Sequence, residues 1–547
     1  MCASITRQQA PFAGPTRSVH EWQMIFHRRS VTRHILAGSA LMLILLAALL
    51  GGCALPTLDG RSVSSALSQA KSADTALGKA IAPRAAAHPG ESGILALQDP
   101  HDAFAARVLL ARAAERTLDV QYYIWRGDTT GMLLLEELHA AAQRGVRVRL
   151  LLDDNGTAGL DTELAALDSH PNIEVRLFNP FVIRTPKMIG FVTDFSRANR
   201  RMHNKSFTAD SQATIIGGRN VGNEYFGATA GVLFADLDVL AVGAVLPDLA
   251  ADFDRYWASN SAYPAELILD ESDPAQLPAF SERVREVAAA PQAREYIQAI
   301  RDSGFFNDFL QGQLPLEWAF TRIVSDDPAK GLGQAEQEDL LMHQLGEILG
   351  RPETDVELIS PYFVPTAAGT EAFARLASRG VRISVLTNSL DATDVAVVHA
   401  GYAKRRKALL EAGIRLYELR RLAPQRTKAD TPGPFGSSGS SLHAKTFSVD
   451  RARVFVGSFN FDPRSANLNT ELGFVIESPI MAQAIESAFE ATIPASSYEV
   501  LLSDSGKLYW LERNADGQVR HDTEPHTSFW KRTSVSLMSI LPIEWML

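Results

Sequence analysis

Apolar and polar positions in the globular part of the chain follow two periods, one helical and one extended. Residues 103–117 place alanine, valine and leucine at helical spacing, and residues 117–125 form the apolar run expected of a buried strand. Residues 132–145 are a second helical stretch that ends at a glycine, and residues 146–154 are a second strand rich in branched side chains. This alternation predicts an α/β sandwich in which helices cover a mixed β-sheet.

The same order of strand, helix and strand returns in the second part of the chain. Residues 355–364 predict a strand, residues 371–380 a helix that ends at a glycine, and residues 381–389 another strand. Two eight-residue segments match position by position. They are GVRVRLLL, from Gly145, and GVRISVLT, from Gly380. The chain therefore contains two similar halves.

Polar residues keep the same register as the apolar ones. The word HNKSFTAD at 203–210 matches HAKTFSVD at 443–450, so that both have the form HxKx4D. In each copy a glycine follows the histidine by fourteen residues, an asparagine follows it by seventeen, and a tyrosine precedes it by 81; these residues are Gly217, Asn220 and Tyr122, and Gly457, Asn460 and Tyr362. Such constant offsets indicate an internal duplication in which each half carries half of one shared site.

Composition divides the remaining chain into stretches of different character. The predicted divisions are a signal or membrane-anchor segment (1–57), a flexible tether (58–93), the first half (94–270), a helical connecting segment (271–350), the second half (351–500) and a C-terminal extension (501–547). The Pro-, Gly- and Ser-rich loop 428–441 ends just before the second motif. It is either a lid over the site or a tolerated surface insertion.

An uncharged apolar run of sixteen residues, 35–50, lies near the N-terminus. It is marginal for a membrane-spanning helix and nearer in length to the apolar part of a secretory signal, and arginines just before it supply the positive region of such a signal. Counted from Met1 that region exceeds thirty residues. Counted from Met24 it has an ordinary length, which favours Met24 as the true start.

The end of the apolar run, Leu50-Gly51-Gly52-Cys53, resembles a bacterial lipobox. That resemblance implies cleavage before Cys53 and attachment of lipid to its thiol, and the alternative is an uncleaved N-terminal anchor. Either reading holds the catalytic part at a bacterial membrane, with the periplasmic side expected. Ala54 lacks the aspartate that often retains lipoproteins in the inner membrane.

Overall composition narrows the function classes. The 547 residues are 46% hydrophobic and 21% charged, as in ordinary globular proteins, and the net charge is −10. An acidic total argues against a nucleic-acid partner, because binding to phosphate backbones needs a basic surface. The two cysteines, Cys2 and Cys53, cannot supply a zinc site alone, so no metal and no cofactor is predicted.

The paired motifs suit phosphoryl chemistry. In a strand, residues two apart share a face, so His203 and Lys205 project together, as do His443 and Lys445. Two lysines, with the amides of the two asparagines, can neutralise a phosphate without a metal ion. Two imidazoles suit a two-step displacement in which one attacks phosphorus and the other moves protons between alcohols.

On these residues the chain resembles the phospholipase D superfamily, over roughly residues 99–490. The resemblance implies two αβα sandwich halves with mixed β-sheets packed around one shared active site. It implies that His203 is the nucleophile and His443 the general acid/base. It assigns phosphate binding to Lys205, Lys445, Asn220 and Asn460. It assigns orientation of the histidine rings to Asp236 and Glu471, with Asp238 a weaker choice than Asp236. It gives the motif aspartates, Asp210 and Asp450, a bracing role in the fold.

Longer words in the sequence resemble the bacterial branch called cardiolipin synthase C. They are QYYIW, NRRMHNKSF, GGRNVGNEYF, ISPYFVP, VHAGYAKRRKALLEAG and the final LPIEWML. The branch implies phosphatidyl transfer that makes cardiolipin from phosphatidylglycerol and a second phospholipid, expected to be phosphatidylethanolamine. The alternatives are hydrolysis of phospholipid head groups, a nuclease of the same superfamily, and a catalytically dead envelope protein. Protein partners are not predicted.

Two basic clusters could recruit anionic lipid. Arg197, Arg200 and Arg201 precede the first motif, and residues 404–407 carry four consecutive basic side chains on a predicted helix. Each basic residue near an anionic surface contributes about 1 kcal/mol. For the second cluster a solvated helix face is the favoured interpretation.

Overall fold

The computed structural model describes residues 55–227, 236–273, 275–302, 308–309, 311–393, 395–421, 442–514, 517–541 and 544–547. Residues 58–547 form one compact unit. The apolar run 35–50, the lipobox-like Cys53 and the loop 428–441 lie outside the described residues. Within the described part, no helix combines the length and the apolar character needed to cross a bilayer.

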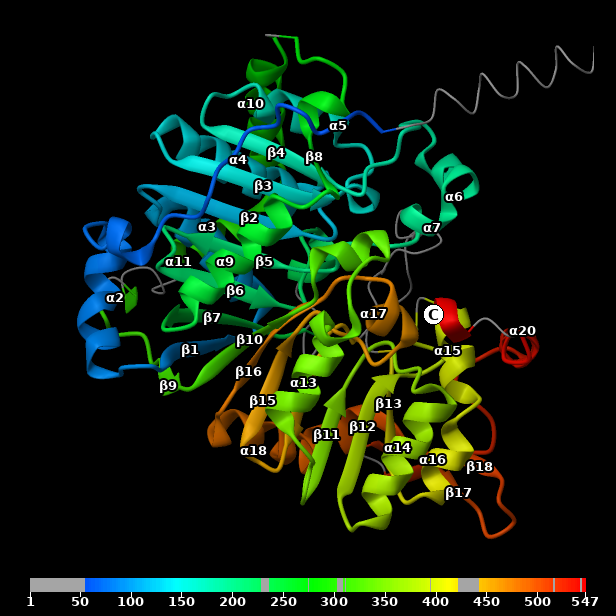
Figure 1. Cartoon of the computed structure of the whole chain (residues 1–547). Coiled ribbons are helices and arrows are strands. Elements are labelled where there is room, and N and C mark those ends of the chain that lie inside the picture. The colour runs from blue at the N-terminus through cyan, green and yellow to red at the C-terminus, as the bar shows by residue number, and fades with distance from the viewer. Residues whose placement is uncertain are drawn as a thin grey trace, which may run out of the picture. The chain divides into compact units, whose positions relative to one another are not determined.

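The first half is built on a nine-stranded mixed sheet (Figure 1). Its strand order is β8-β4-β3-β2-β5-β6-β7-β1-β9, in which only the β2–β3 and β3–β4 pairs are parallel. The strands are β1 (Ser92–Leu97), β2 (Thr117–Tyr122), β3 (Arg147–Asp153), β4 (Ile173–Phe178), β5 (Ser206–Ala209), β6 (Ala213–Gly217), β7 (Asp238–Gly243), β8 (Ala262–Pro264) and β9 (Glu317–Ala319).

The second half is built on a ten-stranded mixed sheet. Its order is β10-β16-β15-β14-β11-β12-β13-β17-β18-β19, in which only the β11–β12 and β12–β13 pairs are parallel. The strands are β10 (Thr321–Ser325), β11 (Asp355–Ile359), β12 (Arg382–Asn388), β13 (Arg415–Leu419), β14 (Thr446–Val449), β15 (Arg453–Gly457), β16 (Leu472–Ile476), β17 (Ser497–Leu502), β18 (Leu508–Asn514) and β19 (Gly517–His521).

The two sheets repeat one topology, which confirms the predicted α/β fold with two similar halves. The series β8-β4-β3-β2-β5-β6-β7-β1 corresponds to β17-β13-β12-β11-β14-β15-β16-β10, with the same parallel and antiparallel pairs. Strand β9 is added to the first sheet, and the β18–β19 hairpin to the second.

One detail of the predicted repeat is wrong. Asp210 N donates to Thr117 O in the first half, and Asp450 N donates to Asp355 O in the second, so these contacts define equivalent positions. Counted from them, Tyr122 corresponds to Ser360 and not to Tyr362. The second half has two more residues between this strand and its motif, so a constant offset from the histidine fails there.

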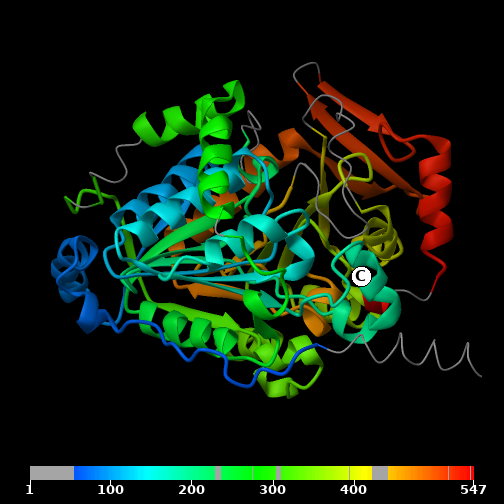
Figure 2. The ribbon, with the colours of Figure 1, turned by 90° about the horizontal axis from the view of Figure 1, so that it is seen from above.

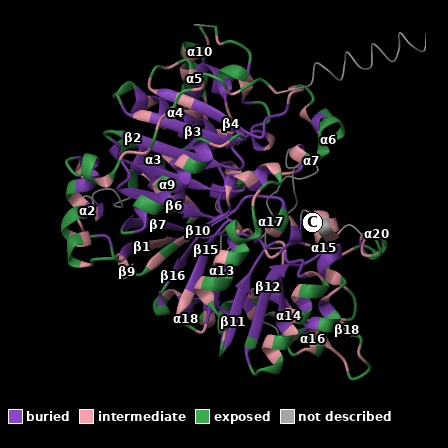
Figure 3. Ribbon diagram, in the orientation of Figure 1, coloured by how far each residue is buried: buried purple, intermediate pink, exposed green. Residues whose placement is uncertain are grey.

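Helices cover both faces of each sheet. The outer face of the first sheet packs against α3 (Pro100–Ala113), α4 (Thr129–Gln143), α5 (Asp161–Asp168), α10 (Gln276–Ala289) and α11 (Arg294–Asp302). The outer face of the second packs against α13 (Leu341–Leu349), α14 (Thr366–Ser378) and α16 (Arg406–Glu411). Figure 3 shows the strands buried and the helices exposed on their outer sides.

The inner faces of the two sheets share a third core. It joins apolar side chains of β6 and β7 to those of β15 and β16, and it includes α9 (Leu246–Trp257), α18 (Pro479–Ser487) and α19 (Ile493–Ser496). Burial of apolar surface is the main stabilising term in folding. The two halves therefore form one folded unit through a joint core.

Local sequence signals set the element boundaries where caps are present. The side chain of Asp99 accepts hydrogen bonds from His101 N at 2.8 Å and Asp102 N at 3.0 Å, and Pro100 occupies the first turn of α3. These residue types satisfy the unpaired amides of a helix N-terminus and pre-set its backbone. Helix α4 begins in the same way, with Asp128 accepting from Gly131 N.

The stretch 58–93, expected to be a flexible tether, is structured. It contains α2 (Ala76–Ala87) and runs along the body as the blue segment of Figure 2. Arg61 Nη1 donates to Ser259 O at 2.6 Å, and Ala66 N donates to the Asp254 carboxylate at 2.9 Å. Leu77 and Ile81 of α2 are also buried in the core of the first half, but two apolar residues among polar ones give no clear period in the sequence.

The connecting and C-terminal stretches also differ from the expected divisions. Helices α10 and α11 and strand β9 complete the first half, whereas β10 and α13 already belong to the second. Strands β18 and β19 extend the second sheet and are not a separate appendage. Short strands of three to five residues carry too little periodicity to be recognised in sequence.

Candidate active site

A short bridge between the halves precedes the first motif. Residues Met202 and Thr470 pair in parallel, with His203 N donating to Thr470 O at 2.8 Å and Thr470 N donating to Arg201 O at 2.9 Å. The residue after Thr470 is Glu471. The bridge therefore sets this carboxylate of the second half beside the histidine of the first.

The His203 ring is held by that carboxylate. Its Nδ1 lies 2.8 Å from Glu471 Oε2, and the edge of the Tyr123 ring packs against it with 4.9 Å between ring centroids. Ser458 Oγ donates a hydrogen bond to the same carboxylate oxygen. Since Nδ1 is engaged and His203 lines a cavity, its Nε2 is the nitrogen available to a substrate.

The His443 ring is held in the mirrored way. Its Nδ1 lies 2.7 Å from Asp236 Oδ2, and the Tyr225 ring packs against it at 5.1 Å between centroids. Asp236 belongs to the first half and His443 to the second. Each half thus supplies the carboxylate that orients the other half's histidine, and neither half contains a complete pair.

Burial and neighbouring cations tune the first pair. Burial, followed by the charges of Lys205 and Lys445, holds the pKa of His203 well below its ordinary value. Burial also raises the pKa of Glu471 to about 7, although Lys205 opposes this rise. Near neutral pH His203 is therefore an uncharged imidazole, the form that can act as a nucleophile.

The second pair has a different balance. Burial and then Lys445 lower the pKa of His443 to about 4, against the opposing effect of Asp236. Burial alone would raise the pKa of Asp236, but His443 and Arg219 outweigh it and hold that pKa below the ordinary range. Asp236 is consequently ionised at all ordinary pH values.

The motif lysines bend back onto their own histidines. Lys205 Nζ donates to His203 O at 2.5 Å and lies 5.6 Å from the centroid of the Tyr123 ring, and Lys445 Nζ donates to His443 O. Burial, with the charge of Lys445, lowers the pKa of Lys205 well below its ordinary value. Lys445 lines the cavity, whereas Lys205 lies behind His203.

The predicted phosphate-binding asparagines both line the cavity. Asn220 Oδ1 accepts a hydrogen bond from Ile124 N at 3.2 Å, and Asn460 N donates to Ser465 Oγ at 3.3 Å. Among the described residues, Asn220 Nδ2 and Asn460 Oδ1 have no hydrogen-bond partner. Buried amide atoms without partners are costly, so these side chains are suited to meet a substrate.

The motif aspartates lie away from the cavity. Asp210 Oδ1 accepts from Arg116 N at 2.7 Å and from Thr117 N at 2.9 Å, and Asp450 Oδ1 accepts from Thr354 N at 2.8 Å. Both aspartates have positive φ, 52° and 54°, in the two-residue turn that follows the motif strand. They connect this hairpin to the start of the neighbouring strand, a bracing position and not a catalytic one.

The cavity shared by the two motifs has a volume of about 110 Å³. One wall is polar and contains His203, His443 and the two asparagines. The opposite wall is apolar and contains Val395, Val397, Val398, Met546 and Leu547. The motif analysis did not find the apolar wall, because its members come from α15 (Ala396–Ala403) and from η10 (Glu544–Met546) near the end of the chain.

Further polar residues at the cavity were missed from the sequence, namely Asp462, Arg464, Ser465 and Asn469. Arg464 is fixed by Asn199, to whose side-chain oxygen its Nη1 donates at 2.8 Å, and burial raises the pKa of Asp462 to about 6. The available signal was the polar segment DPRS (462–465), which starts two residues after Asn460 and differs from the sequence after Asn220.

No cluster of three or more histidine, cysteine, aspartate or glutamate side chains suited to a metal ion occurs in the described ranges. The positive charge at the cavity comes from the lining residues Lys445 and Arg464, and Lys205 lies outside the lining. These groups can stabilise the charge that develops on a phosphate oxygen during transfer.

Comparison with known proteins agrees with this geometry. The family model described as "Cardiolipin synthase, PLD-like domain" matches residues 109–257 and 345–493, once in each half. The chain is 51% identical over 476 residues to cardiolipin synthase C of Escherichia coli (strain K12), covering 86% of this chain and 99% of that protein. It is 25% identical over 391 residues to cardiolipin synthase B of Shigella flexneri, covering 72% and 78% of the two chains.

A solved structure supports the fold alone. The crystal structure of phosphatidylserine synthase from Haemophilus influenzae Rd KW20 superposes with a TM-score of 0.52 at 13% identity, covering 83% of this chain and 95% of that one. The paired sheets are thus an arrangement already observed in a crystal.

Proposed function

Since the chain belongs to the phospholipase D-like family of cardiolipin synthases, we propose that it is a phosphatidyltransferase that joins two phospholipids into cardiolipin. The observation that carries this proposal is the crossed arrangement of the two histidine–carboxylate pairs at one cavity. Two histidines with separate partners can divide attack and proton transfer between them, as a two-step transfer requires.

In the first step His203 is the nucleophile. The lone pair of its Nε2 forms a bond to phosphorus while the ester bond to the departing head-group alcohol breaks. His443 gives a proton to the oxygen of that alcohol. Glu471, which accepts from Nδ1, stabilises the positive charge that forms on the phosphorylated ring.

His443 needs a proton for this step, although its pKa of about 4 keeps it neutral in the protein alone. A bound phosphodiester carries a negative charge and meets Lys445, which lines the cavity. It offsets the charge of Lys445 that lowers the pKa of His443, so the imidazolium becomes accessible in the complex.

In the second step the neutral His443 takes the proton of an incoming primary hydroxyl. The oxygen of that hydroxyl attacks phosphorus, the phosphorus–nitrogen bond breaks, and its electron pair returns to His203 Nε2. With the glycerol hydroxyl of phosphatidylglycerol as acceptor, the product is cardiolipin. Water as acceptor would give phosphatidic acid instead.

The donor is phosphatidylethanolamine, so ethanolamine is the leaving alcohol. This choice is the one implied by the resemblance of the sequence to the cardiolipin synthase C branch. The test is purified full-length protein with phosphatidylethanolamine labelled in its head group and unlabelled phosphatidylglycerol. Release of labelled ethanolamine together with cardiolipin is expected. Release of glycerol alone would mean that two phosphatidylglycerol molecules react, and accumulation of phosphatidic acid would mean hydrolysis.

The reaction requires no metal ion, because the lysines supply the positive charge at the phosphate. Activity should therefore persist in excess EDTA. Loss of activity on chelation, restored by magnesium or zinc, would contradict the phosphohistidine scheme.

The enzyme is held at the periplasmic face of a bacterial membrane by lipid on Cys53. The Leu50-Gly51-Gly52-Cys53 word after the apolar run supports this placement. Labelled palmitate should enter the wild-type protein but not the Cys53→Ser variant, which should retain its N-terminal segment. Wild-type protein that carries no acyl label would show an uncleaved anchor instead.

A further inference from the structure

Large apolar side chains are exposed in two short segments. Of the fifteen that are exposed among the described residues, nine lie in residues 188–195 and 529–541. The most exposed in the two segments are Val192 at 85%, Trp530 at 78% and Ile540 at 77%. Exposed apolar groups that gather in this way mark an interaction surface.

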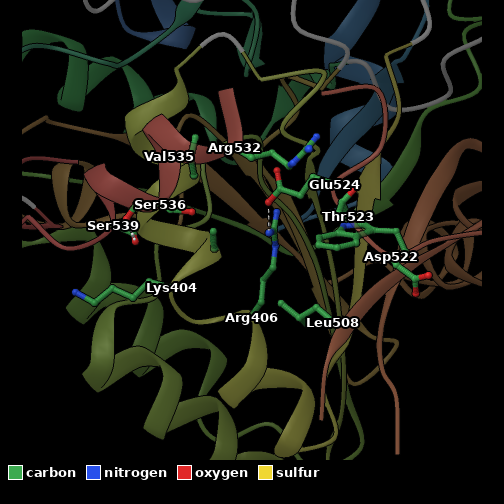
Figure 4. A pocket seen from close by; sticks show the side chains of 12 residues that line it. Lys404, Arg406, Leu508, Asp522, Thr523, Glu524, Arg532, Val535, Ser536 and Ser539 are labelled. Atoms are coloured by element: carbon green, nitrogen blue, oxygen red, sulfur yellow. Dashed lines mark hydrogen bonds and ion pairs between the residues drawn. The ribbon is translucent and has the colours of Figure 1, made fainter. Parts of the chain in front are cut away.

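Helix α20 (Phe529–Met538) presents its apolar residues outward, the reverse of an ordinary surface helix. Its inner side carries Val535, which packs against Leu390 and Ala400, and Lys531 Nζ, which donates to Leu390 O at 2.6 Å. Figure 4 shows Val535 and Arg532 beside the hollow that separates α20 from Arg406. The helix is thus fixed by few contacts and keeps an apolar outer face.

The segment formed by η3 (Lys187–Ile189), α6 (Gly190–Thr193) and α7 (Phe195–Ala198) is also fixed from inside. Lys187 Nζ donates to Asp154 Oδ1 at 2.9 Å, and Arg197 Nη1 donates to Pro180 O at 2.9 Å. Gly190 lies against the Phe181 ring, where a Cβ atom would be only 2.4 Å from the ring. Polar anchors therefore hold the segment while its apolar residues face outward: Met188, Ile189, Val192 and Phe195.

Both segments lie near the catalytic cavity, each separated from it by one neighbouring element. Met188 lines a hollow of about 620 Å³ that shares Tyr123 with that cavity. Helix α20 packs against α15, whose Val397 and Val398 form the cavity's apolar wall. Figures 1 and 2 show α6, α7, α20 and the end of the chain on one side of the molecule.

Basic residues flank both apolar segments, although the whole chain is acidic. Residues 181–201 contain five basic residues and one acidic residue, and residues 528–541 contain two basic and no acidic ones, in a chain of net charge −10. Several of them, such as Lys187 and Lys531, are the inward anchors, so the outer face itself is mainly apolar. Exposed apolar residues backed by basic ones suit an anionic bilayer, into which such helices enter at the head-group level.

We propose that residues 188–195 and α20 form one docking face that inserts into the surface of an anionic phospholipid bilayer and opens the cavity towards it. This deepens the proposed function, on which it rests, because a lipid substrate would then reach His203 without crossing water. The occupant is the bilayer, and not a second copy of the chain or its residues 1–54.

Tryptophan quenching by brominated lipid tests the insertion. Full-length protein is reconstituted into vesicles of phosphatidylglycerol and phosphatidylethanolamine with brominated acyl chains. The fluorescence of Trp530, obtained by subtracting the emission of Trp530→Phe from that of wild type, should be quenched. In the Trp530→Phe background, a tryptophan introduced by Val192→Trp should also be quenched.

The matched control is Phe320→Trp in the same background. Phe320 is 54% exposed and directly follows β9, which lies away from α6 and α20 in Figure 1. An N-terminal anchor alone would bring all positions equally near the membrane. Quenching of a tryptophan at position 192 that is no stronger than at position 320 would overturn the proposal. In that case a smaller sedimentation coefficient for Val192→Asp than for wild type would show that the face binds a second copy of the chain.

Activity separates docking from catalysis. On vesicles, the rate of the double variant Val192→Asp/Ile540→Asp should be lower than the wild-type rate by a factor of about ten or more. On monomeric short-chain phospholipid the rate of the double variant should equal the wild-type rate. The control variant Phe320→Asp should have the wild-type rate on both vesicles and monomers. Equal loss on monomers and vesicles would overturn the docking face. If wild type turns over neither substrate, the proposed function fails, whereas the quenching still decides the docking face.

Discussion

The two histidine–carboxylate pairs occupy equivalent places in the two halves but differ in their surroundings. Glu471 and Asp236 are each followed by a leucine, Leu472 or Leu237, whose backbone carbonyl accepts a hydrogen bond. The donor is the backbone amide of the residue after the glycine that both halves share, Gly457 or Gly217. In the second half that residue is Ser458, whose hydroxyl bonds to Glu471. In the first half it is Gly218, where a Cβ atom would lie 2.3 Å from Asp236 Oδ1.

The difference adapts one scaffold to two tasks. A longer carboxylate, fully buried beside a neutral hydroxyl, has a pKa raised to about 7 by burial, and in the proposed reaction it serves the nucleophile His203. A shorter carboxylate, beside Arg219 and His443, has its pKa held below the ordinary range, and in the proposed reaction it serves the acid/base. A permanent negative charge stabilises a histidine that must carry a proton, whereas a nucleophile needs a partner that fixes its tautomer.

The largest effects should come from the histidines themselves. His203→Ala should abolish both cardiolipin formation and any covalent adduct, because no other ring replaces its Nε2. His443→Ala should slow both steps by about 10²–10⁴-fold, yet a donor whose leaving group needs no proton should still load His203. Radiolabelled donor and acid quench measure the adduct, which should be acid-labile and alkali-stable.

The control for these variants is His343→Ala, since His343 lies exposed on α13. It should retain the wild-type rate. A His203→Ala protein that makes cardiolipin at the wild-type rate would refute the assignment of the nucleophile.

The carboxylates should differ in the size of their effects. Asp236→Asn removes an ionised acceptor from His443 and should lower the transfer rate roughly 10- to 150-fold, the range for a hydrogen bond to a charged group. Glu471→Gln replaces a carboxyl that is only partly ionised near neutral pH and should cost roughly 2- to 10-fold. Steady-state transfer rates at pH 7 compare them, and equal losses would contradict the unequal ionisation.

With a donor whose leaving group needs no proton from His443, the pH dependence of adduct formation should belong to the first pair only. Protonated Glu471 can no longer accept from His203 Nδ1, which favours the tautomer with hydrogen on Nε2 and blocks attack. With a carboxyl pKa of about 7, the single-turnover rate should rise roughly tenfold per unit up to pH 7 and level off above it. In Glu471→Gln this rise should vanish, whereas Asp236→Asn should keep it. A rise that persists without Glu471 would assign it to another group.

The smallest effects should come from the residues that adapt each carboxylate. Gly218→Ala must displace Asp236 and should slow proton transfer by less than about tenfold, and Ser458→Ala should slow adduct formation by a similar factor. Gly346→Ala, on α13 with no atom within 4 Å of the added Cβ, is the matched control. Rates of the two separate steps in each variant test whether each change acts on its own pair.

Much of the fold could be predicted because its signals are local. Strands such as β2 and β3 are buried on both faces and are rich in apolar and branched residues, and the helices before β3 and β12 are followed by Gly145 and Gly380, which have positive φ. The duplication followed from constant spacing. The short strands β9 and β10 could not be predicted, since three to five residues carry little periodicity.

The sequence by itself determined which residues can do the chemistry, because the two HxKx4D motifs stand in matching registers of the two halves, although residues 203–205 and 443–445 precede the motif strands and do not share a strand face. Only the tertiary structure decided how they combine. His203 meets a carboxylate 268 residues away, and His443 one 207 residues away, because the inner faces of two sheets share a core. The apolar wall at Val397 and Leu547 has the same origin, since packing between distant segments leaves no trace in local periodicity.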